Sequence, residues 1–156
     1  MIERIRRLLW PKKIRHPYLW RPHYVGKHYG KAFLVLGSGP TINTHSTLIR
    51  QFIGRKFPVV LAANYPPLEL PVDYVAFCNR LRFCNYGPRA QALATESLLI
   101  DPHIPTWLVN HILGTWRRWE RMPYRAEQAP FNIEDGIVGC DCGQTGILLM
   151  AVAFVM

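Results

Sequence analysis

Runs of consecutive apolar residues, each about the length of a strand, recur along the chain from residue 32 onward. Each run ends at or near a glycine or an asparagine. Continuous apolar runs of this kind are typical of strands that are buried on both faces, as in a parallel sheet. The pattern predicts four strands, at Ala32–Leu36, Val59–Ala63, Val72–Phe77 and Pro105–Val109.

Stretches with helical spacing of apolar positions lie between these runs and after them. They predict helices over Thr44–Phe52 and Pro88–Leu99, and a buried helix over the wholly apolar segment Thr145–Met156. Residues 114–139, which are rich in Trp, Arg and Pro, are expected to be irregular. The alternation of strands and helices predicts an α/β fold in residues 32–156: a Rossmann-like, mostly parallel sheet with flanking helices.

Residues 1–31 form a separate segment that carries most of the positive charge. Nine lysines and arginines and one glutamate there give +8 of the formal net charge of +9. Residues 2–10 have the pattern of a short basic amphipathic helix, and a connector rich in proline and aromatic residues follows. Two interpretations of this arm stay open: a solvated or partner-covered extension, and a contact with an anionic membrane surface or nucleic acid.

The composition is that of a globular protein that does not span a membrane. The longest uncharged apolar stretch, Thr145–Met156, is too short to cross a bilayer, which needs about 20 residues. Leu8–Trp10 is too short for the apolar part of a secretory signal, so we expect a cytoplasmic protein that can lie beside the inner membrane face. The cysteines lack the spacing of a common zinc site and are interpreted as reduced thiols: Cys78, Cys84, Cys140 and Cys142.

A short glycine-containing loop, made of Gly37, Ser38, Gly39, Pro40 and Thr41, follows the first predicted strand. Glycine has no Cβ, so the backbone can turn sharply there and approach a ligand closely. The main-chain N–H groups of the loop and of the helix after it can then face a phosphate. The loop is therefore a candidate phosphate-binding site, although a strand followed by glycine and proline also makes an ordinary turn.

Three asparagines follow the other predicted strands: Asn64, Asn79 and Asn110. Ligands of open α/β sheets bind at the carboxyl ends of the strands, and an amide can read a base or ribose edge. A further candidate ligand-contacting segment is Gln144, Thr145 and Gly146, where small polar residues come just before the apolar helix. The alternative is that each asparagine is a turn or capping residue and that Thr145 only caps its helix.

These motifs resemble, in order and spacing over residues 32–156, the bacterial sialyltransferases of glycosyltransferase family 42. The resemblance lies in the first strand with Gly-Ser-Gly-Pro-Thr, and in Ala63–Tyr65 and Tyr74–Asn79. It is strongest at Gln144–Ala153, where a Thr-Gly pair opens an apolar helix. A related Rossmann-like family, which includes pterin pyrophosphokinase-like proteins, shares the opening motif.

The resemblance implies inverting transfer of a sugar from a CMP-sugar donor to an acceptor hydroxyl, on a glycan or another acceptor. Residues 37–41, Asn64 and Asn79 would hold the nucleotide, and residues 144–146 would line the same pocket. The chain contains no Asp-x-Asp motif, which agrees with the metal-independent members of that family, and no other cofactor is implied.

The chain departs from that family at its carboxyl end. Members continue past the apolar helix into another strand, a tyrosine pair that contacts the donor phosphate, and a histidine base. No residue here matches those features, so we expect a C-terminally truncated portion of a longer domain. Truncation there would leave apolar surface of the last helix uncovered, which favours a partner or an oligomer. The catalytic base is unassigned, and His103 and His111 are interpreted as surface or connector histidines.

Two other functions compete with a glycosyltransferase. A pterin pyrophosphokinase-like enzyme would use ATP and magnesium, but the only adjacent acidic pair, Glu134–Asp135, lies in the stretch expected to be irregular. A non-enzymatic nucleic-acid- or partner-binding module would use the basic arm with its interleaved aromatic residues. Binding through the arm would weaken steeply with salt, whereas binding at the glycine loop would survive removal of the arm.

Overall fold

A computed structural model of the chain describes residues 25–65, 67, 69–93, 95, 97–114, 118–122, 124–126, 132–134, 137–140 and 145–156. The basic helix expected over residues 2–10 and the predicted site residue Gln144 lie outside these ranges.

The centre of the fold is a five-stranded sheet in which each strand is parallel to its neighbours. The strands stand in chain order and are β1 (Phe33–Leu36), β2 (Val59–Ala63), β3 (Tyr74–Phe77), β4 (Ser97–Ile100) and β5 (Trp119–Arg121). This sheet and its flanking helices confirm the predicted α/β, Rossmann-like fold. Because all five strands are parallel, their carboxyl ends meet at one edge of the sheet.

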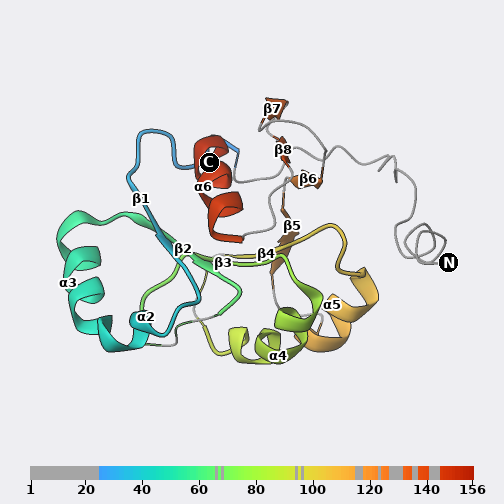
Figure 1. Ribbon diagram of the computed structural model, residues 1–156, viewed down its shortest axis with the longest axis horizontal. Coiled ribbons are helices and arrows are strands. Elements are labelled where there is room, and N and C mark those ends of the chain that lie inside the picture. Colours follow the sequence, from blue (N-terminus) through green and yellow to red (C-terminus); the bar gives the residue numbers. More distant parts are fainter. Residues whose placement is uncertain are drawn as a thin grey trace, which may run out of the picture.

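Helices cover both faces of the sheet (Figure 1). The crossover helices between consecutive strands lie together on one face: α2 (Thr41–Thr44), α3 (Ser46–Lys56), α4 (Arg80–Ala90) and α5 (Thr106–Leu113). This is the outcome expected when strands follow one another in one direction through right-handed connections. The opposite face is covered over β1, β2 and β3 by α6 (Thr145–Val155).

The two faces of the sheet have separate apolar cores, which explains the uninterrupted apolar runs. Val60 and Ala62 of β2 pack in the core beneath α3, α4 and α5. Their neighbours Val59 and Leu61 pack in the core under α6. Every residue of β2, β3 and β4 is buried, so both alternating sets of side chains must be apolar or small.

The predicted apolar helix is present as α6, but only one side of it is buried. Leu148, Leu149 and Val152 face the core, whereas Met150 and Phe154 are 52% and 84% exposed. The segment before β1 caps the carboxyl-terminal end of α6. The backbone N–H groups of residues 26 and 28 donate to the carbonyls of residues 155 and 156, at 2.7 and 2.6 Å. These bonds satisfy carbonyls that a helix end leaves without partners.

A second, three-stranded sheet lies beside β5 and α6, in the region expected to be irregular. It has the order β6-β8-β7, and its strands are β6 (Tyr124–Ala126), β7 (Asn132–Glu134) and β8 (Ile137–Cys140). Strands this short show little periodicity in a sequence, so the prediction of an irregular stretch over residues 114–139 was wrong for β5, β6, β7 and the first three residues of β8.

Two other predicted elements were wrong. The run Pro105–Val109 is not the fourth strand but the beginning of α5, and its apolar positions continue at helical spacing to Ile112 and Leu113. The fourth strand is β4, at the end of a stretch predicted to be helical. Pro88 is not in the first turn of a helix, where proline is favoured, but near the end of α4.

Close packing of α4 on α5 leads to a prediction about Gly87. A Cβ placed on Gly87 would lie 2.9 Å from Ile112 Cγ2 and 3.1 Å from Cε2 of the fully buried Phe83. We expect Gly87→Ala to lower the free energy of unfolding by about 1–3 kcal/mol, because neither neighbour can move freely. In urea denaturation the comparison variant Gly54→Ala, at an exposed position in the last turn of α3, should instead raise the free energy of unfolding, by up to about 0.5–1 kcal/mol. Equal stability of the two variants would contradict this packing.

Candidate functional site

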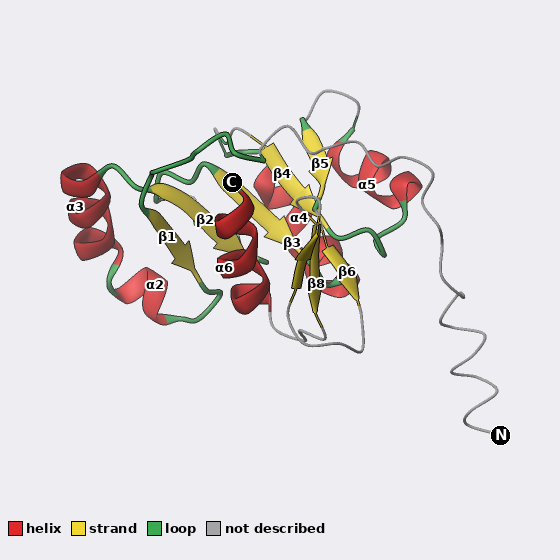
Figure 2. Ribbon diagram, turned by 90° about the horizontal axis from the view of Figure 1, so that it is seen from above, coloured by secondary structure: helices red, strands yellow, loops and turns green. Residues whose placement is uncertain are grey.

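The sheet register places the residues that follow β1 to β4 in one row. Leu36 pairs with Ala62, Ala63 with Ala76, and Phe77 with Ile100. The residues that follow these strands are therefore neighbours along the carboxyl edge: Gly37, Asn64, Cys78 and Asp101. Figures 1 and 2 show the amino-terminal end of α6 and the loop after β1 at this same edge.

Asn64 joins three elements at the centre of the edge. Its Nδ2 donates to Thr145 Oγ1 at 2.6 Å, and its Oδ1 accepts the backbone N–H of Cys78 at 3.2 Å. Its backbone lies in the left-handed region, with φ of 57°, and its own N–H donates to the carbonyl of Ala76 at 2.7 Å. Asparagine tolerates this conformation better than most residues. The side chain thus fixes the first residue of α6 against the ends of β2 and β3.

Cys78 lies beside this cluster as an unreactive thiol. Burial raises its pKa to about 12; a hydrogen bond with Thr145 opposes the rise, and the charge of Asp101 adds to it. A thiol with this pKa stays protonated at neutral pH and is a poor nucleophile. Cys84 is exposed on α4, and both thiols are free.

The glycine loop is on the surface, with every residue from Gly37 to Thr41 exposed. Neither of its glycines has a positive φ. A Cβ on Gly37 would meet nothing within 4 Å, and one on Gly39 would meet only Thr41 Oγ1, at 3.6 Å. The turn itself therefore does not need glycine. What the two glycines leave is open space above the backbone, which a ligand can occupy.

Gly146, in the first turn of α6, has the same property. A Cβ on Gly146 would meet no atom within 4 Å. The first turn of this 11-residue helix is therefore bare of side chain next to Thr145. Free N–H groups at such a helix start attract anions.

The other predicted asparagines do not join the cluster. Asn79 is the N-cap of α4, where its Oδ1 accepts the backbone N–H of Arg82 at 3.1 Å. The capping interpretation therefore holds for this residue, and its oxygen is already used. Asn110 is exposed within α5 and follows no strand, because the strand predicted before it is a helix.

The sequence prediction missed Asp101, which follows β4 as Asn64 follows β2. Its carboxylate is buried, with the residue 3% exposed, and it bonds His103. The signal was an apolar run, Leu98–Ile100, followed by an acidic residue and proline. It was hidden because this run was assigned to a helix.

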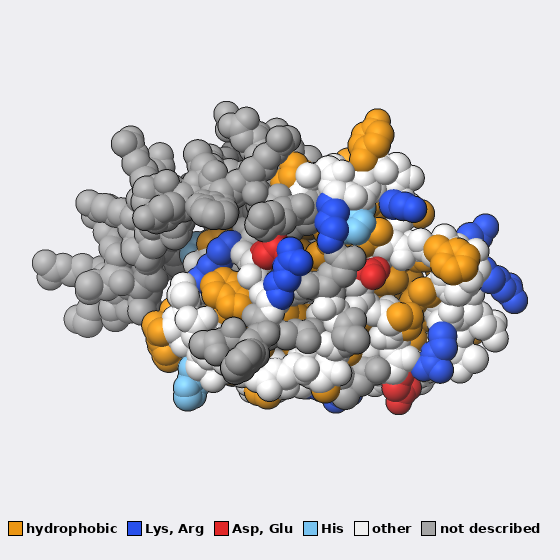
Figure 3. Space-filling model, turned by 180° about the vertical axis from the view of Figure 1, so that it is seen from behind, with side chains coloured by type: hydrophobic (Ala, Val, Ile, Leu, Met, Phe, Trp, Pro, Cys, Tyr) orange, Lys and Arg blue, Asp and Glu red, His pale blue; other side chains and the backbone are white. Residues whose placement is uncertain are grey.

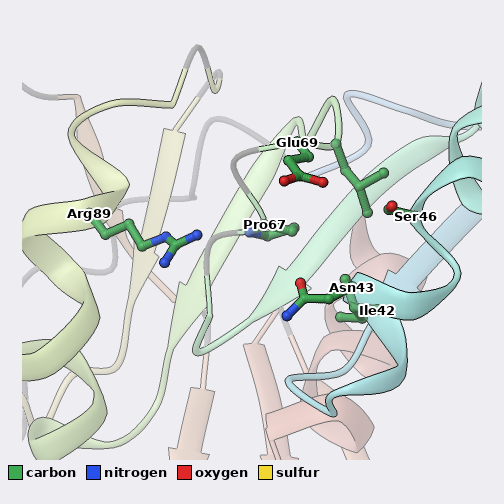
Figure 4. A pocket seen from close by; sticks show the side chains of 7 residues that line it. Ile42, Asn43, Ser46, Pro67, Glu69 and Arg89 are labelled. Carbon is green, nitrogen blue, oxygen red and sulfur yellow. The ribbon is translucent and has the colours of Figure 1, made fainter.

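A separate groove lies on the face of the sheet that is covered by α2, α3, α4 and α5 (Figure 4). Since β2 and β3 are connected without a helix, α3 and α4 stand apart and leave an open space of about 250 Å³, solvent included. It is lined by Ile42, Asn43, Ser46, Pro67, Glu69, Leu70 and Arg89. None of these is a predicted site residue, although Ile42 directly follows the glycine loop.

Metal ligands, membrane-spanning helices and clustered surface charge are three further features that bear on the function. Among the residues placed by the structure, no three His, Cys, Asp or Glu side chains gather where they could hold a metal ion. No helix in the same part of the chain is long and apolar enough to cross a bilayer. On the face shown in Figure 3, the coloured Lys and Arg side chains are scattered among apolar and uncharged groups and form no continuous stripe.

Comparison with known protein families, with characterised proteins and with solved structures finds no significant match.

Substitution of Asn64 should lower the stability of the protein, although the residue is only partly buried. Asn64→Ala loses both side-chain hydrogen bonds and keeps the left-handed backbone, whereas Asn64→Gly loses the bonds but relieves the backbone. We expect the alanine variant to be less stable than the glycine variant by about 1 kcal/mol in urea denaturation. Asn110→Ala, on the exposed side of α5, is the control and should change stability by less than about 0.5 kcal/mol. Equal stability of Asn64→Ala and Asn64→Gly would contradict the assigned backbone conformation.

Proposed function

We propose that this chain is the nucleotide-sugar-binding part of a sialyltransferase-like glycosyltransferase, which transfers a sugar with inversion from a CMP-sugar to an acceptor hydroxyl. One observation carries the proposal: the bond of 2.6 Å between Asn64 and Thr145 anchors the start of α6 at the carboxyl edge, where the exposed glycine loop also lies. Two glycine-containing segments, residues 37–41 and the first turn of α6, therefore lie at the same edge of the sheet.

The chemistry of this edge suits the nucleotide end of a CMP-sugar. The donor has a single phosphate diester, and the N-terminus of an 11-residue helix offers it both N–H groups and a positive dipole end. Ser38 and Thr41 add hydroxyl donors from the other side. The Asn64 amide is uncharged, and beyond the N–H that it donates to Thr145 its Nδ2 carries a second N–H, which would serve a ribose or base edge.

The basic arm, residues 1–31, would place the protein at an anionic membrane surface. Residues 1–31 carry +8, and a short basic amphipathic segment would hold the protein against anionic lipids at the inner membrane face. Acceptors for surface glycans are built at such membranes, so the arm would bring the donor site to its acceptor. The exposed side of α6, with Phe154 at 84%, is available to a second copy or a partner.

Isothermal titration with CMP, CDP, ATP with magnesium, and a pterin tests the proposal. We expect saturable binding of CMP, with the other ligands weaker. Binding of ATP and magnesium alone would favour the pyrophosphokinase-like function instead, and binding of none of these nucleotides would contradict the proposal.

Removal of the arm separates nucleotide binding from nucleic-acid binding. The deletion should end at residue 24, because the backbone N–H groups of Gly26 and His28 bond the carbonyl ends of α6. CMP affinity should survive this deletion. Loss of all nucleotide affinity with the arm, together with steep weakening by salt, would indicate a nucleic-acid-binding module.

A further inference from the structure

The groove between α3 and α4 presents two opposite charges that are not paired with each other. Glu69 comes from the connection between β2 and β3, Arg89 comes from the last turn of α4, and both side chains line the groove (Figure 4). Both residues are exposed, and within the described ranges no ion pair joins them to each other or to a third side chain. A carboxylate and a guanidinium thus remain available to a ligand in one space.

The guanidinium of Arg89 is held in place from outside the groove. It lies 4.9 Å from the centre of the Tyr65 ring, and that ring packs edge-to-face on Tyr86 with the centroids 5.3 Å apart. A guanidinium held over an aromatic ring keeps the N–H groups of its own plane for a second partner. A carboxylate accepts two such N–H groups in parallel. Arg89 is therefore suited to bind the carboxylate of a ligand.

The loop that carries Glu69 is fixed through its main chain. The Arg50 side chain, on α3, donates to the backbone carbonyl of Glu69. The backbone N–H of Leu70 donates to the carbonyl of Pro67 at 3.1 Å. These bonds do not use the carboxylate of Glu69, which can accept the N–H groups of an ammonium. Because the loop is already ordered, a ligand has less conformational entropy to remove when it binds.

The floor of the groove is apolar. Ile42 and Leu70 are 7% and 4% exposed, and Pro67 is buried between them and the rest of the lining. Asn43 and Ser46 add uncharged polar groups at the α2 and α3 side. The space of about 250 Å³, solvent included, is below the roughly 300–1,000 Å³ of pockets that hold drug-sized ligands. The groove therefore suits a small ligand with a hydrocarbon part.

We propose that this groove binds a small zwitterion with an apolar side chain, either an apolar α-amino acid or a dipeptide of such residues. Its carboxylate contacts Arg89, its ammonium contacts Glu69, and its hydrocarbon part lies on the apolar floor. A phosphate or another simple anion is repelled by Glu69, and a simple cation is repelled by Arg89, whereas a zwitterion is attracted by both. The site is separate from the carboxyl edge, so the inference does not depend on the proposed function.

Isothermal titration of the full chain with four related ligands tests the inference. Leucine and leucyl-leucine carry both charges, N-acetyl-leucine lacks the ammonium, and leucine amide lacks the carboxylate. We expect saturable binding of at least one of the two zwitterions, with both blocked forms weaker by about tenfold or more. In ¹H–¹⁵N spectra the bound zwitterion should shift the backbone amides of Asn43, Glu69 and Leu70, and leave those of Ser38 and Thr145 unchanged.

Two substitutions assign the charges. Arg89→Gln and Glu69→Gln should each lower the affinity for the zwitterion by roughly 10- to 100-fold, because each removes a charge-assisted hydrogen bond. Arg80→Gln is the matched control, since it removes an exposed arginine of the same helix whose guanidinium lies 5.9 Å from the Trp107 ring. It should bind as the wild type does. All three residues are exposed, so the melting temperatures of the variants should match that of the wild type.

Three results would overturn the inference: no binding of either zwitterion, equal binding of leucine and N-acetyl-leucine, or undiminished binding by Arg89→Gln. The proposed function is tested apart from this, because it depends on CMP binding at the carboxyl edge. A chain that binds CMP but no zwitterion would keep the proposed function and lose this inference. A chain that binds the zwitterion but not CMP would do the reverse.

Discussion

Gly39→Val should abolish CMP binding while the protein stays folded. The glycine loop is exposed, and a Cβ on Gly39 would touch only Thr41 Oγ1, at an ordinary 3.6 Å. The branched side chain therefore fits the fold but fills the space above the main-chain N–H groups, where the phosphate would lie. We expect affinity to fall by about 100-fold or more, which corresponds to roughly 2.8 kcal/mol, since each tenfold change in affinity is about 1.4 kcal/mol.

Thermal denaturation and isothermal titration of the same preparation separate a loss of CMP binding from a loss of stability. The melting temperature of Gly39→Val should match that of the wild type. Gly54→Val is the matched control, since Gly54 also has open space around it but lies in α3, away from the carboxyl edge. This control should bind CMP as the wild type does. Undiminished CMP binding by Gly39→Val would show that the glycine loop is not part of the nucleotide site.

Leu149→Ala should be the most damaging substitution in α6. Leu149 is fully buried in the core between α6 and the sheet. Truncation leaves a cavity in addition to the lost transfer free energy, so we expect the free energy of unfolding to fall by about 2–5 kcal/mol. This is a large share of the roughly 5–15 kcal/mol by which a domain is stable. Urea denaturation followed by circular dichroism measures it.

The neighbouring variant Met150→Ala supplies the control for that experiment. Met150 is 52% exposed on the other side of the same helix. Its truncation should change stability by less than about 0.5 kcal/mol. Similar losses for Leu149→Ala and Met150→Ala would mean that a partner or a second copy covers the exposed side of α6 in solution.

The sequence predicted the class of fold because its most buried strands leave the clearest pattern. In β2 and β3 both sheet faces are covered, so every position is apolar. The strand predicted at Val59–Ala63 matches β2, and the one predicted at Val72–Phe77 contains β3, which begins two residues later. Residues 105–109 were misassigned because five apolar or small residues look alike in a strand and in the first turns of a helix. The helical continuation to Leu113 was the missing information.

The site was less accessible from the sequence than the fold. Asn64 and Thr145 were singled out separately, but they are 81 positions apart, and only the sheet register and the path of α6 bring them into contact. Asn79 looked equivalent to Asn64 in the sequence, yet it caps a helix. Asp101 was overlooked because its strand was assigned to a helix, and His103 then appeared to be an unpartnered surface residue.

If the proposed function is correct, the carboxyl edge, formed by the glycine loop, Asn64 and the start of α6, binds the nucleotide. Titration of ¹⁵N-labelled protein with CMP, followed residue by residue in ¹H–¹⁵N spectra, tests it most directly. We expect saturable shifts of the backbone amides of Ser38, Gly39, Thr145 and Gly146, and of the Asn64 side-chain amide. Shifts confined to Asn43, Glu69 and Arg89 in the groove on the other face, or no shifts at all, would contradict it.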